Sequence, residues 1–238
     1  MKKYELTNET ITIDNGKTLY RIRALIDIEA IGVKIGDLGG YIEKEENLSH
    51  CGNAWVYDDA MVYDNAIIYD DAIIYDDAKV SDNAKVYDNA MVYGNAMVCD
   101  NANVYGTSMI CGNVDVFSNA RIFGNARAHD DAWIYGNAMV HGNAEVYGNA
   151  EIFGNARVCG DAEINKVTHV LTIDPIGSRN STTTFFRTKE NIIKVKCGCL
   201  YGTIDEFLAK MELTHGNNKH GQAYRIAAEL AKVQIDLE

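Results

Sequence analysis

Proline is almost absent from this chain of 238 residues, in which Pro175 is the only one. Long apolar runs are absent too, because no stretch approaches the roughly 18 residues that a membrane span requires. No basic-then-apolar leader opens the chain, so we expect neither a membrane protein nor a secreted one. The six cysteines lack the paired spacing of a zinc knuckle or a disulfide framework, and we expect reduced thiols in a cytoplasmic protein.

Basic residues are scarce in the middle of the chain. Residues 54–165 contain 5 Lys and Arg against 17 Asp and Glu, a balance that equals the net charge of −12 of the whole chain. Residues 166–238, in contrast, carry 10 basic and 8 acidic residues. Because non-specific binding of nucleic acid requires a basic surface, we expect none along the middle. An anionic partner is expected to bind the C-terminal part.

A period of six residues runs through about half of the chain. An aliphatic residue recurs from Val56 to Ile164, with Ala128 as the one departure from Val or Ile, and the residue two positions earlier is Ala at 17 of 19 places. Six fits neither a 3.6-residue helix nor a plain alternating strand. It fits a solenoid in which each hexad is one short strand, with the aliphatic side chain inside and the next one outside. Asp, Asn or Gly then forms the corner, because these residues tolerate left-handed backbone angles.

Three hexads would close a coil of 18 residues, and residues 54–167 would form the stack. Outward side chains then fall into three columns, which hold Tyr57, Tyr75, Tyr93, Cys111, His129 and Tyr147; Tyr63, Ser81, Cys99, Phe117, Tyr135 and Phe153; and Tyr69, Tyr87, Tyr105, Phe123, His141 and Cys159. So many outward aromatic residues indicate a covered surface, by self-association or by an aromatic ligand. Corner aspartates stack as well, and we interpret them as turn residues rather than as a cation site, so that no metal site is predicted.

The hexads resemble the hexapeptide-repeat left-handed parallel β-helix family, whose motif is aliphatic-x-x-x-small-x. The resemblance implies left-handed coils, a homotrimer, and relatives that are acyltransferases or zinc carbonic anhydrases. Those enzymes place a catalytic His beside a coil or on an ejected loop, or gather three His around a metal. No loop leaves these coils, and His129 and His141 project from different faces. We therefore predict a scaffold without a catalytic residue or a cofactor.

Residues 1–53 precede the repeat. Two alternating strands are expected around Asp14-Asn15-Gly16, a strong hairpin signal. The stretch RIRALIDIEAIGVKIGDLGGYIEKEENLSHCGNAWVY resembles the N-terminal segment of YdcK-like bacterial and prophage hexapeptide-repeat proteins, which are described as transferases from their fold alone. We expect this capping segment to close the open end of the solenoid.

Residues 168–238 are expected to form a small α+β module with a hairpin and two helices. Alternation in TTTFFRTK and IIKVKCGC predicts the hairpin, Thr203 to Glu206 form a capping box, Gly216 can end the first helix, and residues 219–234 predict the second. The stretches IGSRNSTTTFFRTK, VKCGC, GTIDEF and THGNNKH resemble a C-terminal module of phage and prophage hexapeptide-repeat proteins. That resemblance implies no particular activity, and it implies the host cytoplasm if a phage encodes the chain.

This module holds the candidate binding residues, which are hydroxyls and cations: Ser178, Arg179, Thr182, Thr183, Thr184, Arg187, Lys189, Lys196, His215, Lys219 and His220. Hydroxyl donors with Arg forks beside a Gly-Ser turn suit a phosphate. The alternative is structural, because Thr is common in strands and Arg pairs with acids. Our hypothesis is a non-enzymatic oligomer that binds, and even sequesters, a phosphorylated small molecule such as a nucleotide signal, an anti-defence role. An acyltransferase using an acyl-CoA and a structural or protein-interaction trimer are the alternatives.

Overall fold

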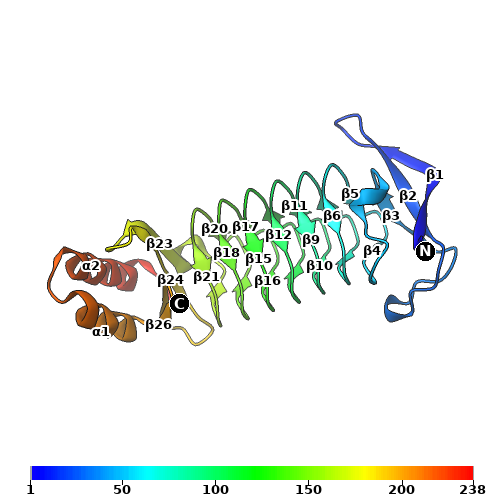
Figure 1. The fold of residues 1–238 in the computed structure, drawn as a ribbon. Coiled ribbons are helices and arrows are strands. Elements are labelled where there is room, and N and C mark those ends of the chain that lie inside the picture. The colour runs from blue at the N-terminus through cyan, green and yellow to red at the C-terminus, as the bar shows by residue number, and fades with distance from the viewer. Residues whose placement is uncertain (1, 238) are drawn as a thin grey trace.

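The chain forms an elongated rod in the computed structural model, which describes residues 2–237 (Figure 1). Antiparallel strands form one end, short parallel strands form the long middle, and an α+β unit forms the other end. The N-terminal elements are β1 (Tyr4–Thr12), β2 (Thr18–Ala24), β3 (Leu38–Ile42) and two 3₁₀ turns (Glu29–Ile31 and Glu45–Asn47).

The N-terminal strands extend one face of the solenoid. β1 and β2 form the predicted hairpin, whose turn closes through the bond from the Gly16 N–H to the Ile13 carbonyl (2.8 Å). β3 pairs in parallel with a strand of the first coil, in the register Tyr41 with Met61. The Asn47 side chain donates to the carbonyl of Ala66 (2.8 Å), so backbone groups of a second face are also covered at this end.

Between the two ends, the described chain forms 19 strands of two residues each. They are β4 (Trp55–Val56), β5 (Met61–Val62), β6 (Ile67–Ile68), β7 (Ile73–Ile74), β8 (Lys79–Val80), β9 (Lys85–Val86), β10 (Met91–Val92), β11 (Met97–Val98), β12 (Asn103–Val104), β13 (Met109–Ile110), β14 (Asp115–Val116), β15 (Arg121–Ile122), β16 (Arg127–Ala128), β17 (Trp133–Ile134), β18 (Met139–Val140), β19 (Glu145–Val146), β20 (Glu151–Ile152), β21 (Arg157–Val158) and β22 (Glu163–Ile164). Each strand from β4 to β19 pairs in parallel with the strand three places on, in three sheets that end at β20, β21 and β22. Ile73 lies beside Met91, so one coil takes 18 residues, as the period predicts.

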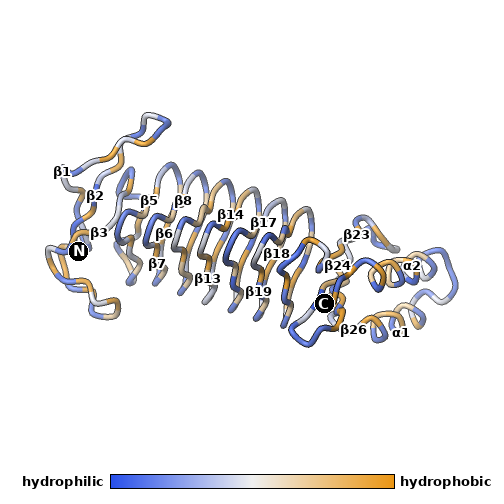
Figure 2. The backbone as a smooth tube through the Cα atoms, turned by 180° about the vertical axis from the view of Figure 1, so that it is seen from behind, coloured by the Kyte–Doolittle hydropathy of each residue, from blue (hydrophilic) through white to orange (hydrophobic). Residues whose placement is uncertain are grey.

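The repeat is built as its residue types require. The aliphatic residues and the corner alanines are almost completely buried, whereas the corner residues before each Asn or Asp have positive φ angles, such as 57° at Asp76 and 74° at Gly136. Figure 2 shows hydrophobic and hydrophilic stretches alternating around every coil. The solenoid core is therefore a column of Val, Ile and Ala.

Polar side chains bind one coil to the next at the corners. The Asp76 carboxylate accepts from the Gly94 N–H (3.0 Å), and Asp100 accepts from the Ser118 N–H (2.8 Å). In the column that contains Asp100 and Ser118, asparagine side chains also donate from coil to coil, at the successive positions Asn65, Asn83, Asn101, Asn119, Asn137 and Asn155. The corner aspartates thus have a structural partner in the following coil, which accounts for their column without a cation.

Outward aromatic rings stack along each face. Ring centroids lie 4.8 Å apart for Tyr69 and Tyr87 and 4.5 Å apart for Tyr75 and Tyr93, with nearly parallel planes. A third stack joins Tyr135 to Phe153 at 5.6 Å. The columns predicted from the 18-residue period are therefore present.

The C-terminal unit is a four-stranded antiparallel sheet with two helices. After a 3₁₀ turn (Val167–His169), it comprises β23 (Val170–Ile176), β24 (Ser181–Arg187), β25 (Ile193–Cys197), β26 (Leu200–Thr203), α1 (Ile204–His215) and α2 (Lys219–Gln234), and the strands lie in that order. The predicted hairpin is β24–β25, and both predicted helices are present. β23 and β26 were not predicted. Among the described residues, neither helix has the length and apolar character needed to cross a membrane.

The sheet of this unit has two covered faces. Phe185 and Val195 pack with Phe207 of α1 and Tyr224 of α2 in a core of their own. Phe186, whose side chain follows that of Phe185 on the opposite face, packs into the solenoid core. One face of the sheet therefore covers the last coil and the other carries the helices.

Candidate functional site

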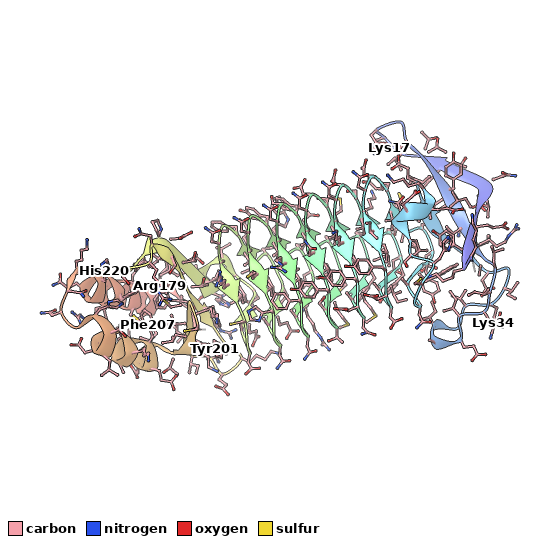
Figure 3. The ribbon with its side chains drawn as sticks, in the orientation of Figure 1. Lys17, Lys34, Arg179, Tyr201, Phe207 and His220 are labelled. Carbon is pink, nitrogen blue, oxygen red and sulfur yellow. The ribbon has the colours of Figure 1, made fainter. Side chains whose placement is uncertain are left out.

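The candidate residues of the sequence do not gather in one place. Thr184, Arg187 and Lys189 contact the solenoid, whereas Arg179 and His220 lie at the far end of the rod, opposite Lys17 and Lys34 (Figure 3). Two sites must therefore be considered separately.

At the solenoid junction, Thr184 is buried and its Oγ1 accepts from the Arg157 N–H of the last coil (3.0 Å). Arg187 lies 3.7 Å from the Glu163 carboxylate and donates to the Glu163 carbonyl (3.3 Å). Lys189 pairs with Glu145 (3.0 Å). The polar groups of these three residues are therefore used in joining the C-terminal unit to the coils.

Lys196 also faces the solenoid, because it lies opposite Thr184 in the β24–β25 ladder. Burial lowers the pKa of His141, and the charge of Lys196 lowers it further. Burial raises the pKa of the Cys159 thiol, and Lys196 opposes that rise. Lys196 thus lies near the end of one aromatic column, away from Arg179.

At the distal end, the phenol of Tyr224 connects the β23–β24 turn to the sheet. Its Oη packs so closely on Gly177 that a Cβ added there would lie 1.8 Å away. The Cys197 thiol donates to this oxygen (3.9 Å) and accepts from the buried Thr183 hydroxyl (3.2 Å). Burial, and then Cys197, raise the pKa of Tyr224 to about 12, and the nearby charge of Arg179 opposes the rise.

Two histidines complete this distal cluster. The His215 ring lies 5.8 Å from the ring of Tyr224, and the His220 ring lies 5.9 Å from that of His215. His220 and the exposed Lys219 stand in the first turn of α2, which contains no acidic residue. Since a helix N-terminus carries partial positive charge, basic side chains there concentrate positive potential.

The charge of Arg179 is not neutralised by a neighbouring acid. Its guanidinium makes no ion pair or hydrogen bond with any other described residue, and the side chain is exposed together with Ser178. By contrast, Arg225 in the same unit pairs with Glu212 (2.7 Å). We call Ser178, Arg179, His215, Lys219 and His220 the distal cationic cluster; Thr182 lies half-buried on β24 nearby in sequence.

Sequence reasoning missed Tyr224 and Cys197 as parts of this cluster. Tyr224 is the one aromatic residue in α2, and its buried position among Ala227, Ala228 and Ala231 marks the helix face that meets the sheet. The signal was present as an aromatic on an alanine-rich face. The contact with Gly177, however, depends on how the helix packs.

The solenoid contains one further cluster around His129. Its Nε2 lies 3.4 Å from Glu145 and its Nδ1 lies 3.3 Å from Asp130, beside a hollow of about 300 Å³ that Arg127 and Cys111 also line. Both ring nitrogens face carboxylates, so neither is placed to take a proton from Cys111. This geometry does not favour an acyl-transfer dyad.

A second group, Asp82, Cys99 and Asp100, has ligand atoms within 4.8 Å of one another at a corner. Burial, and then the adjacent carboxylates, raise the pKa of Cys99 to about 11. The thiol therefore keeps its proton at neutral pH in the metal-free protein.

These features define a β-solenoid scaffold closed by an antiparallel end unit that carries a cationic tip. The model of the YdcK β-solenoid repeat matches residues 54–70 and 84–100, so these coils are similar to that repeat family. No curated protein is significantly similar to the chain.

His169 gives the junction a pH dependence. It is buried, its Nδ1 accepts from the Asn165 N–H (3.4 Å), and burial followed by the charges of Arg187 and Lys166 lowers its pKa. An unfolded His binds a proton near pH 6.5, before the folded one does. The free energy of unfolding should therefore fall as the pH drops from 7 through about 6.5 and below.

Urea denaturation at pH 7.5 and 5.5 measures this loss. His169→Asn keeps an acceptor for the Asn165 N–H but does not titrate, so its stability should fall less between the two values. Equal losses in both proteins would contradict the assignment to His169.

Proposed function

We propose that this protein binds a phosphorylated small molecule of the nucleotide class at the distal cationic cluster. In this proposal the protein binds the ligand without catalysing a reaction of it. The observation that carries the proposal is Arg179, an exposed guanidinium without an acidic partner among the described residues. In a chain with a net charge of −12, an unpaired Arg among other cationic side chains favours an anion.

The chemistry of the cluster supports a phosphate in particular. A guanidinium offers two parallel donors that match two phosphate oxygens. The hydroxyl of Ser178 and the ammonium of Lys219 add further donors, and the Tyr224 phenol keeps its proton up to a pH of about 12. The rings of His215 and His220 offer further nitrogen donors to phosphate oxygens.

The rest of the proposal concerns assembly and place. Half-buried aromatic columns support self-association of the coils, and the family resemblance implies a homotrimer. We place the protein in the cytoplasm, where nucleotide signals occur, and in the host cytoplasm if a phage encodes it; sequestration of such a signal would be an anti-defence function. Light scattering on the purified chain measures its mass.

Isothermal titration calorimetry with nucleoside mono-, di- and triphosphates and cyclic dinucleotides tests the binding. We expect Arg179→Ala to weaken the affinity at least tenfold, because it removes a charge-assisted pair of hydrogen bonds. Lys210→Ala is the matched control, because it also removes one exposed positive charge from the C-terminal unit. Arg187→Ala should leave the affinity unchanged, since Arg187 already binds Glu163.

Absence of binding to the whole panel would refute the proposal. So would equal effects of Arg179→Ala and Lys210→Ala, because these would show non-specific attraction. An effect of Arg187→Ala larger than that of Arg179→Ala would move the site to the solenoid junction.

A further inference from the structure

The last coil of the solenoid is covered unequally on its three faces. Every coil donates N–H groups to the carbonyls of the next coil, as the Tyr135 N–H does to the Ile152 carbonyl (2.9 Å). At the last coil, the Arg157 N–H donates to Thr184 Oγ1 and the Asn165 N–H donates to His169 Nδ1. On each of these two faces one N–H group thus ends on a side chain of the C-terminal segment, whereas the N–H groups of Cys159 and Asp161 have no acceptor among the described residues.

The third face, which ends at β20, stays open. The N–H groups of Glu151, Phe153 and Asn155 correspond to the donors of the preceding coils, but they have no acceptor among the described residues. β20 pairs only with β17 there and forms the edge of its nine-stranded sheet. The donors of Glu151 and Phe153 lie along a free strand edge, and the donor of Asn155 follows in the corner after Gly154, whose φ is 64°.

This edge opens into a groove of about 530 Å³ beside the C-terminal unit, lined largely by apolar side chains. Its opposite wall includes Val170 and Leu171 of β23, which is itself an edge strand. The side chains of Phe153 and Val167 line the groove and remain 53% and 54% exposed. Trp133, one coil earlier beside Glu151, is also 47% exposed, so the apolar surface continues along the face.

We propose that this groove binds an extended, basic peptide segment of a partner protein, which adds as a strand to the edge of β20. The donors at 151 and 153 are spaced for the carbonyls of alternate residues in an extended chain, and the donor at 155 lies in the adjacent corner. The carbonyls of a helix already accept hydrogen bonds within the helix, and a small ligand does not offer a series of regularly spaced acceptors.

Charge selects a basic partner. Among the described residues that line the groove, Glu151 and Asp174 are acidic and none is Lys or Arg, and the Asp174 carboxylate also accepts from the Asn155 side chain. The solenoid behind it is strongly acidic, so Lys or Arg in the peptide would be attracted from a distance and held at the rim. Apolar side chains at alternate positions would then face Phe153 and Val167.

Selection of a random heptapeptide display library on the full-length chain tests the proposal. Counter-selection uses Phe153→Pro, which removes a donor that has no acceptor and leaves the carbonyl of residue 153, which accepts from Ala156, in place. Enriched sequences should alternate apolar residues with Lys or Arg. Synthetic copies should bind Phe153→Pro at least tenfold more weakly than Phe153→Ala, which loses the same ring but keeps the N–H.

Hydrogen exchange of the wild-type protein provides a measurement that does not depend on the variants folding. A bound peptide should slow exchange of the amides at 151, 153 and 155 and leave the distal cationic cluster unchanged. No enrichment, equal affinity for Phe153→Pro and Phe153→Ala, or protection elsewhere would overturn the proposal. Protection that rises with protein concentration in the absence of peptide would also overturn it, because the occupant would then be a second copy of this chain.

Discussion

Replacement of Gly136 by valine should lower the free energy of unfolding by about 3 kcal/mol, whereas replacement by aspartate should lower it by a smaller amount, about 1 kcal/mol. Gly136 has a φ of 74°, and a Cβ added to it would lie 2.8 Å from the backbone nitrogen of Gly154 in the next coil. A β-branched residue is strained in this region and has no room to move away from the stack.

Aspartate is the matched control because the protein already uses it at equivalent corners. Asp130, for example, has a φ of 61° and its carboxylate accepts from the Gly148 N–H (3.2 Å). Gly136→Asp would offer the same acceptor to the Gly154 N–H. Urea denaturation followed by circular dichroism measures both variants, and equal losses would show that steric contact, not the hydrogen bond and backbone angle, governs the corner.

The solenoid could be predicted in detail because its rules are local and repeated. Each hexad alone indicates which residue lies inside and which turns the corner. A departure from the pattern, such as Ala128 at an aliphatic position, does not change the prediction, because the other hexads keep the same register. The 18-residue coil, the aromatic columns and the parallel register all follow from that count. The N-terminal hairpin and α1 were also predicted from short signals, a turn and a capping box.

The C-terminal unit was harder because its arrangement depends on distant partners. β23 was missed: its sequence contains Pro175, and its pairing with β24 places Val170 beside Phe186. Strand alternation predicts that Thr183 and Thr184 face opposite ways. Only the structure shows that Thr184 faces the last coil and Thr183 faces Cys197.

The dependence on distant partners also explains why the predicted site included too many residues. A stretch rich in Ser, Thr and Arg suits a phosphate, but it also suits a strand that must satisfy the end of a solenoid. Arg179 and Arg187 lie in the same Ser/Thr-rich stretch and look alike in the sequence. In the structure Arg187 binds Glu163, whereas Arg179 has no acidic partner among the described residues. Which cation is available depends on the acids that folding brings near it.

Replacement of Thr184 by valine should lower the free energy of unfolding by about 2 kcal/mol, the cost of leaving a buried donor without a partner. The side chain is buried, and its Oγ1 is the acceptor for the Arg157 N–H at the end of the last coil. Valine fills nearly the same space but offers no acceptor. Denaturation in urea measures the loss.

Thr184→Ser separates this hydrogen bond from packing, because serine keeps the hydroxyl and loses only a methyl group. It should cost about 1 kcal/mol, the value of one buried methyl group. Hydrogen exchange should show faster exchange at Arg157 in Thr184→Val but not in Thr184→Ser. If both variants lost equal stability, the Thr184 hydroxyl would not be the group that stabilises the Arg157 N–H at the end of the last coil. The nucleotide affinity of Thr184→Val should equal that of the wild type, because a residue that ends the solenoid is not available to the distal cationic cluster.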